Sequence, residues 1–292
     1  MTIRIHIGAH KTATTEMQHA LRSVRLRLEE AGVSYRGPGG LRGNWIALRR
    51  ALLHVDSDEH NHAQMRLRSW LGRAQHYLLS EENILGSAHR RQVFGPGNRL
   101  YPFAEVSITR LLALMGNPEV ELFLAIRDPA EFVTSAYGQV LREGVAMAIE
   151  DYVQGYDVAA FSWADLAARL TACPGVTRLV CWRYEDYAAL RPRIMSELLG
   201  KEAAALVPPM ASHNAGISEA AYQQFCTWIM DDVDIELSFV DLLQRARAAH
   251  PKKPGEPGMR PLPPEVYANS RMAYPRDVAA LQAMKGVTLL LP

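Results

Sequence analysis

Residues 3–17 have the sequence Ile-Arg-Ile-His-Ile-Gly-Ala-His-Lys-Thr-Ala-Thr-Thr-Glu-Met, and this stretch decides the fold. Three isoleucines alternate with polar residues, which predicts a short β-strand. Gly8 interrupts the alternation, and helical spacing of apolar residues follows from Glu16 to Ala31, where Gly32 provides a helix stop. A strand, a tight loop and a helix in this order indicate the beginning of a doubly wound nucleotide-binding fold.

Compact apolar runs later in the chain predict three more strands, of the kind that helices cover on both faces. These runs are His76–Leu79, Val120–Ile126 and Thr177–Trp182. Helical patterns lie at Asn44–Leu53, Ser107–Met115, Glu131–Arg142 and Trp163–Thr171, and late helices are expected within Ser218–Arg247. Alternating strands and helices predict an α/β fold, doubly wound, with a mainly parallel central sheet, P-loop-like nucleotide-binding topology and helices on both faces.

The chain has 292 residues, 48% of them hydrophobic and 22% charged, which is enough to bury a large core. We expect one domain over residues 1–292. The segment 250–264 is rich in proline and glycine, which excludes a regular helix or strand and predicts a flexible loop. This loop is either an inert connector or a flap over a site.

Charge limits the classes of partner. Lys+Arg number 32 against 31 Asp+Glu, so a general nucleic-acid binder is not expected. Residues 41–110 nevertheless contain ten Arg, no Lys and six acidic residues. That local excess of four positive charges is either a solvated helical face or a surface that attracts an anionic acceptor.

Several features exclude other classes of protein. The three cysteines follow no metal-ligand spacing and form an odd set, which is a poor disulfide framework. His54, His60 and His62 match no ligand spacing either, and a solvated loop is expected there. The first residues lack a signal peptide, and no apolar run approaches the ~18 residues of a membrane span. We therefore expect a cytoplasmic protein without a metal.

The loop that follows the first strand is a candidate phosphate site. A loop at this place directs backbone N–H groups at a phosphate, and the helix N-terminus adds a partial positive charge. Lys11 adds a full charge and the threonines add hydroxyl groups; the alternatives are an exposed loop lysine and, for Thr14 or Thr15, a helix cap. The predicted binding residues are His10, Lys11, Thr12, Ala13, Thr14 and Thr15.

This loop differs from the Gly-x-x-x-x-Gly-Lys-Ser/Thr loop of ATP and GTP hydrolases, because it holds one glycine ahead of the lysine. The apolar run 122–126 also leads to Arg127 rather than to a magnesium-binding aspartate, and Asp128 comes one residue later. Both observations weaken a kinase or NTPase interpretation.

Two motifs together carry a family resemblance. Residues 5–18, with Lys-Thr-Ala-Thr-Thr at their centre, resemble the 5′-phosphosulfate loop of sulfotransferases that use 3′-phosphoadenosine 5′-phosphosulfate (PAPS). Residues 126–137 resemble the 3′-phosphate motif of that family, with Arg127 at a strand end and Ser135 eight residues later. The pattern Arg-Asp-Pro-x-x-Phe-x-x-Ser-x-Tyr-x-Gln, which ends at Gln139, is most similar to the bacterial, carbohydrate-type branch.

PAPS carries phosphate at both ends of its ribose, so its site needs two separate anion clamps. Arg127 offers a planar fork of donors for one of them, and Ser135 on the following helix can fold back beside it. The alternatives are an ion pair of Arg127 with Asp128 or Glu131, and a plain surface serine. Lys11 stabilises the charge that grows on the oxygen of the departing 3′-phosphoadenosine 5′-phosphate (PAP), and no metal is required.

The acceptor hydroxyl also needs a general base. Glu81 and Glu82 follow the second predicted strand, and the carboxyl ends of parallel strands meet at one edge of the sheet. Glu82 is the first candidate, Glu81 the second and His10 the third, while one carboxylate can instead cap the next helix. From the resemblance, Tyr184 and Glu185 are expected to brace the site from outside. The segment 250–264 departs from the loop that closes over the nucleotide in that family, so either Lys252 or Lys253 serves that purpose or neither does.

The favoured hypothesis is therefore a PAPS-dependent sulfotransferase that acts on a hydroxyl, or less readily an amine, of a carbohydrate, lipid or small metabolite. A second hypothesis is a P-loop small-molecule kinase that uses ATP and magnesium. A third is a nucleotide-binding module without catalytic activity.

Overall fold

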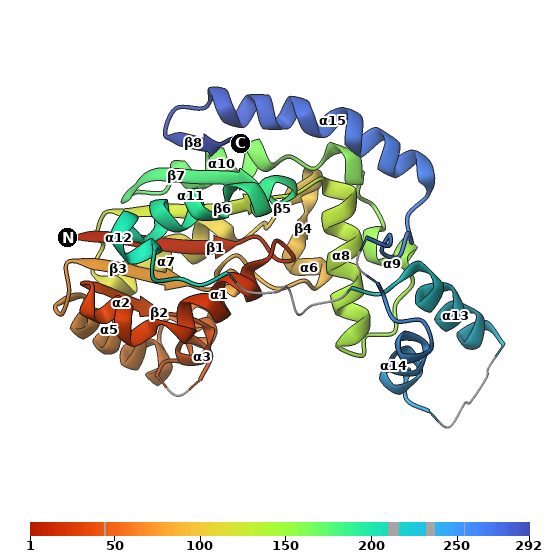
Figure 1. Cartoon of the computed structure of the whole chain (residues 1–292), viewed down its shortest axis with the longest axis horizontal. Helices are drawn as coiled ribbons and strands as arrows, with labels where there is room; N and C mark the ends of the chain where they lie inside the picture. Colours follow the sequence, from red (N-terminus) through yellow and green to blue (C-terminus); the bar gives the residue numbers. More distant parts are fainter. Residues whose placement is uncertain (44, 210–215, 232–236, 254) are drawn as a thin grey trace.

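The structure, a computed structural model, describes residues 1–43, 45–209, 216–231, 237–253 and 255–292. A six-stranded sheet with the order β2-β3-β1-β6-β7-β8 forms its centre, and each neighbouring pair of strands is parallel (Figure 1). The strands are β1 (Thr2–Gly8), β2 (Val33–Arg36), β3 (His76–Ser80), β6 (Val120–Ile126), β7 (Val176–Arg183) and β8 (Val287–Leu290). The first strand lies inside the sheet, so its carboxyl end is flanked by those of β3 and β6.

Helices cover both faces of the sheet, because successive strand side chains point to opposite sides. On one face, residues such as Leu78 and Phe123 pack against α1 (Thr14–Ser23), α2 (Arg25–Glu30), α11 (Tyr187–Leu199) and α12 (Lys201–Ala204). On the other face, residues such as Leu79 and Leu122 pack against α5 (Asp58–Leu71), α7 (Ala104–Met115), α8 (Pro129–Arg142), α10 (Trp163–Thr171) and α15 (Pro264–Ala283). The α/β fold with helices on both faces is thereby confirmed.

Shorter elements complete the molecule. They are α3 (Pro38–Leu41), α4 (Leu48–Leu53), α6 (Arg90–Val93), α9 (Ile149–Val153), α13 (Glu219–Met230) and α14 (Phe239–Ala249), and the two-stranded pair β4 (Phe94–Gly95) and β5 (Arg99–Leu100). Figure 1 shows α13 and α14 side by side at one end of the molecule, next to α8. Four 3₁₀ turns lie at Glu82–Ile84, Pro96–Asn98, Val158–Ala160 and Tyr184–Asp186.

The four predicted strands are confirmed as β1, β3, β6 and β7, and the helix predicted at Trp163–Thr171 has those bounds. The continuous helix predicted over Glu16–Ala31 is wrong, because the chain leaves helical geometry at Val24 (φ −113°, ψ 15°) and divides into α1 and α2. Valine is β-branched and has a weak helix preference, although the apolar face continues across the break. Of the helix predicted at Asn44–Leu53 only Leu48–Leu53 forms, and Asn44 lies outside the described residues.

Other elements were not predicted. The prediction of a loop around His60 and His62 is wrong, because both residues lie in α5. Ser57 caps this helix by accepting a hydrogen bond from the His60 N–H. Residues 250–253 and 255–263 contain neither helix nor strand, apart from an isolated bridge between Gly258 and Ser218, and α15 begins at Pro264. The flexibility of this segment stays a prediction.

Within the described ranges, no helix combines the length and apolar character that crossing a membrane requires. No group of three or more His, Cys, Asp or Glu side chains suited to a metal ion occurs there either.

Candidate functional site

The loop from β1 to α1 turns tightly over the end of β3. Gly8 has φ +105°, and a Cβ atom there would lie 3.0 Å from the Cβ atom of Glu82, so glycine permits this close approach. Lys11 (φ 63°) and Ala13 (φ 64°) both adopt the left-handed conformation. The chain therefore winds around a small concave space before α1 begins at Thr14.

Backbone donors line this concave space. Among the described residues, no hydrogen bond involves the N–H groups of residues 11–16 as donors. These N–H groups stand at the N-terminus of the ten-residue helix α1, whose dipole adds partial positive charge. Donors without acceptors at a helix N-terminus suit a phosphate or sulfate group.

The threonines of the loop have two different environments. The buried hydroxyls of Thr12 and Thr14 both donate to the Ala9 carbonyl oxygen, at 2.7 and 3.2 Å, and so hold the loop in its turn. Thr15 is exposed, and its hydroxyl has no hydrogen-bond partner in the described part of the chain. The alternative that Thr14 or Thr15 caps the helix is wrong, because Ala13 holds the cap position without a side-chain hydrogen bond.

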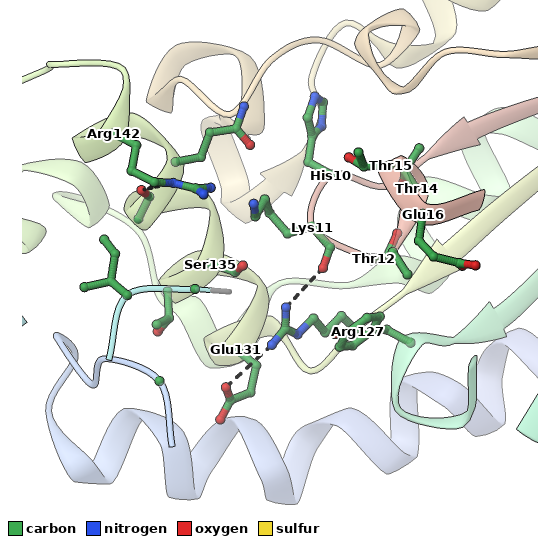
Figure 2. Close-up of a pocket in the computed structure, with 18 of the residues that line it drawn as sticks. His10, Lys11, Thr12, Thr14, Thr15, Glu16, Arg127, Glu131, Ser135 and Arg142 are labelled. Carbon is green, nitrogen blue, oxygen red and sulfur yellow. Dashed lines mark hydrogen bonds and ion pairs between the residues drawn. The ribbon is translucent and has the colours of Figure 1, made fainter. Parts of the chain in front are cut away.

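One cavity of about 310 Å³ brings the predicted residues together. All six loop residues from His10 to Thr15 line it, and Arg127, Ser135 and Glu82 line its other sides. Figure 2 shows Lys11 between the loop and α8, with Ser135 and Arg127 across from it. Glu81 does not line this cavity. The ends of β1, β3 and β6 and the first turns of α8 thus converge on a single space.

Arg127 follows β6 and reaches back to the loop. Its Nη1 atom donates to the Lys11 carbonyl oxygen at 3.1 Å, and its guanidinium lies 4.5 Å from the ring centroid of Tyr184. The ion pair with Glu131 is long, at 3.9 Å, and Glu131 is held more closely by Arg260, at 2.8 Å. The remaining donors of Arg127 are therefore not committed to a close carboxylate.

The alternative pairing of Arg127 with Asp128 does not occur in the described residues. Asp128 caps α8 instead, because its Oδ1 atom accepts hydrogen bonds from the N–H groups of Ala130 and Glu131. Glu185 accepts a hydrogen bond from the Asp128 N–H at 2.9 Å. Glu185 thus supports the site from outside, whereas Tyr184 lines the cavity itself, so the expectation that it lies outside is wrong.

Two further cationic residues, Arg142 and Lys252, line the cavity and were not in the predicted set of nucleotide-binding residues. Arg142, which sequence reasoning missed, lies seven residues after Ser135 on the same face of α8, and its Nε atom donates to the Gly138 carbonyl oxygen. Lys252 enters from the segment after α14 and also lines the cavity, whereas Lys253 does not. The helical spacing from Ser135 was the one feature of the sequence that could have identified Arg142.

The clustered cations change the chemistry of Lys11. Burial, together with the charges of Arg142 and Arg127, lowers the pKa of the Lys11 ammonium to about 8. A polyanion between these side chains reverses the repulsion and favours the charged form of Lys11. The cavity is therefore suited to a ligand with several negative charges.

The two consecutive glutamates occupy different places. Glu81 is 3% exposed, accepts a two-pronged hydrogen bond from Arg42 at 2.7 and 2.8 Å, and caps the following turn by accepting from the Asn83 N–H. Glu82 is 15% exposed and accepts from Gln18 Nε2 at 2.8 Å and from Arg42 Nη2 at 2.7 Å. Burial alone would raise the pKa of Glu82, but Arg42 and Gln18 outweigh it and lower the pKa. Glu82 is thus a carboxylate that faces the cavity, and Glu81 supports the fold.

His10 is poorly placed to act as a base. Its Nε2–H donates to Asn83 Oδ1 at 3.1 Å, so its Nδ1 atom must accept the hydrogen bond that Tyr101 Oη donates at 2.9 Å. Burial also lowers the pKa of His10. Both ring nitrogens are therefore engaged, and the imidazole fixes the loop against Tyr101.

Comparisons with known proteins complete the description. No protein-family model and no curated protein sequence matches the chain. Its structure is similar to the crystal structure of a sulfotransferase from Alicyclobacillus acidocaldarius, with 12% sequence identity and a TM-score of 0.42, over 87% of this chain and 97% of that one. We therefore infer the function from the residues of the site.

Proposed function

We propose that this protein is a sulfotransferase that transfers a sulfuryl group from PAPS to a hydroxyl group of a small or carbohydrate acceptor. The observation that carries the proposal is one cavity with anion-binding groups on two sides. The unpaired N–H groups of residues 11–16 and Lys11 form one side, and Arg127 with Ser135 on α8 forms the other. PAPS needs such a pair of clamps, one for each phosphate-bearing end of its ribose.

Each group has a role that follows from its position. The N–H groups at the start of α1 and the Lys11 ammonium bind the 5′-phosphosulfate end and offset the negative charge that develops there. Arg127 and Ser135 bind the 3′-phosphate, and Tyr184 keeps the guanidinium plane oriented. Arg142 adds a further positive charge beside Lys11.

Glu82 serves as the general base in this proposal. When bound, PAPS supplies the sulfuryl group, whose bond to the nucleotide phosphate breaks as its bond to the acceptor oxygen forms. Glu82 takes the proton of the acceptor hydroxyl, and Gln18 and Arg42 hold the carboxylate in place. We take the whole chain as one catalytic domain and the cytoplasm as its location.

Isothermal titration calorimetry with PAP, ADP and ATP, each with and without Mg²⁺, tests the donor site. We expect PAP to bind without Mg²⁺ and more tightly than ADP, because only PAP occupies both clamps. Arg127→Ala and Ser135→Ala should weaken PAP binding but leave ADP binding nearly unchanged. Arg193→Ala, an exposed residue outside the cavity, is the matched control. Equal affinity for PAP and ADP, or tight binding of ATP only with Mg²⁺, would favour the kinase hypothesis instead.

Transfer of radiolabelled sulfate from PAPS separates an enzyme from a binding module. We expect Glu82→Gln to bind PAP normally but to lower turnover about a hundredfold or more, the usual contribution of a general base. Glu81→Gln should lower stability rather than turnover, because Glu81 holds Arg42 and the turn after β3. Unchanged turnover in Glu82→Gln would exclude Glu82 as the base.

A further inference from the structure

A second cavity, of about 520 Å³, lies on the other side of Glu82. Glu82, Thr15 and His19 line both cavities and form the boundary between them. The second cavity is enclosed by one side of α1, by β2 and by the segment 37–42. A ligand in this space therefore reaches the same carboxylate as a ligand in the first cavity.

A glycine and a tyrosine pack closely in one wall of this second space. A Cβ atom on Gly37 would lie 2.2 Å from the Tyr35 hydroxyl oxygen, so no larger residue fits there. Tyr35 is 2% exposed and lines the cavity, yet its hydroxyl has no hydrogen-bond partner among the described residues. The hydroxyl oxygen is itself buried against the Gly37 backbone, so it forms part of the packed wall and is not a contact for a ligand.

Charge divides the second cavity into two ends. At one end, Arg42 is matched by the two carboxylates Glu81 and Glu82. At the other end, Arg25 and Arg36 share the single carboxylate of Glu29, at 3.1 and 3.6 Å.

Arg22 adds to that second, positive end. It is exposed, and its guanidinium forms no hydrogen bond or ion pair with any residue that the structure describes. Gln18, which contacts Glu82, and Arg22 are one turn apart on α1, or roughly 6 Å along the axis. The cavity thus has the Glu82 carboxylate at one end and an excess of arginine at the other.

We infer that this cavity binds the acceptor, and that the acceptor is an anionic hydroxy compound. Its reactive hydroxyl lies at Glu82, and its carboxylate, sulfate or phosphate group lies against Arg22, Arg25 and Arg36. The inference rests on the proposed sulfotransferase function and adds the chemical class of the acceptor. Arginine suits this role because its planar fork binds oxyanions in pairs of hydrogen bonds.

Matched pairs of candidate acceptors test the charge preference. The pairs are glucose and glucuronate, glycerol and glycerol 3-phosphate, and 4-hydroxybenzyl alcohol and 4-hydroxybenzoate. Sulfate transfer from radiolabelled PAPS gives kcat/KM, and calorimetry at saturating PAP gives binding. We expect the anionic member of a pair to be preferred at least about tenfold, as one charge-assisted contact provides.

Variants identify the arginines responsible. The double variant Arg22→Gln/Arg25→Gln should abolish the preference for the anionic member, because Glu29 then offsets the charge of the remaining Arg36. Arg27→Gln, on the exposed side of α2 and outside the cavity, is the matched control and should keep the preference.

Three results would overturn the inference: equal or better use of the neutral members, a preference that survives in the double variant, or no binding of any anionic member to PAP-loaded protein. Normal PAP binding in these same samples shows that the donor site is intact. A failure of PAP to bind wild-type protein is a separate result, which counts against the proposed function itself.

Discussion

The lowered pKa of Lys11 predicts that nucleotide affinity falls as pH rises above 8. The free protein holds the Lys11 ammonium at a pKa of about 8, well below the ordinary 10.5, because the side chain is buried and faces Arg142 and Arg127. A bound polyanion such as PAP replaces this repulsion with attraction and raises the pKa again. Binding above pH 8 must therefore take up a proton.

The size of the effect follows from the two pKa values. With a pKa of about 8, roughly nine tenths of the free protein carries the Lys11 charge at pH 7 and roughly one tenth at pH 9. If the bound form recovers the ordinary pKa, affinity for PAP falls about tenfold across this range. The phosphate groups of PAP add little slope, because their second ionisation lies near pH 6.

Calorimetric titration of PAP at pH 7, 8 and 9, in buffers of different ionisation enthalpy, measures both affinity and proton uptake. Lys11→Arg is the decisive variant, because its guanidinium stays charged throughout and should bind PAP with little change in affinity from pH 7 to 9. Flat affinity in wild-type protein would refute the assignment of Lys11. A slope that persists in Lys11→Arg would assign the titration to another group.

Three further predictions concern the loop and the base. Gly8→Ala should lower the free energy of unfolding by about 2 kcal/mol in urea denaturation, because it combines an unfavourable positive φ with a 3.0 Å approach to Glu82. Ala13→Gly should change that free energy by less than about 0.5 kcal/mol and keep PAP affinity. Glycine removes the strain of alanine's left-handed conformation (φ 64°), and this gain offsets the entropy that glycine adds to the unfolded chain. Arg42→Gln should move the acid limb of the pH–rate profile to higher pH, because burial then dominates the pKa of Glu82; an unmoved limb would exclude Glu82 as the titrating base.

The sequence predicted the elements that lie deepest in the sheet. β6 and β7 are interior strands buried on both faces, so their apolar runs are nearly continuous, whereas the interior strand β1 was identified by its alternating isoleucines. β2 and β8 are the edge strands, each of four residues; β2 has mixed polarity, and β8 is largely apolar but short. An edge strand owes its existence to the neighbour it pairs with, and that neighbour is distant in sequence.

Unpredicted helices have a related explanation. Pro192 lies inside α11 and Pro275 inside α15, and proline is ordinarily taken as a helix boundary. The tertiary structure keeps both helices because their apolar faces are buried against opposite faces of the sheet. Local preference was a poor guide where packing decided the outcome.

In the candidate site, too, residues on regular elements could be predicted and residues on irregular segments could not. Lys11, Arg127 and Glu82 follow three strands that the sequence identified, and the carboxyl ends of neighbouring parallel strands must adjoin, so their convergence could be predicted. Arg42 and Lys252 come from irregular segments whose paths no periodicity describes. Their positions depend on contacts far apart in sequence.

The adjacent carboxylates Glu81 and Glu82 show how position rather than residue type assigns a role. Glu81 continues the extended backbone of β3 (φ −158°), so its side chain alternates away from that of its neighbour and becomes fixed by Arg42 and the Asn83 N–H. Glu82 begins a turn, and its side chain stays between the two cavities. Arg42 contacts both, so one cation holds the structural carboxylate and orients the proposed base. A base held in this way needs no movement to lie between a donor in one cavity and an acceptor in the other. The proposed chemistry therefore takes place at the boundary between the two cavities and not within either cavity alone.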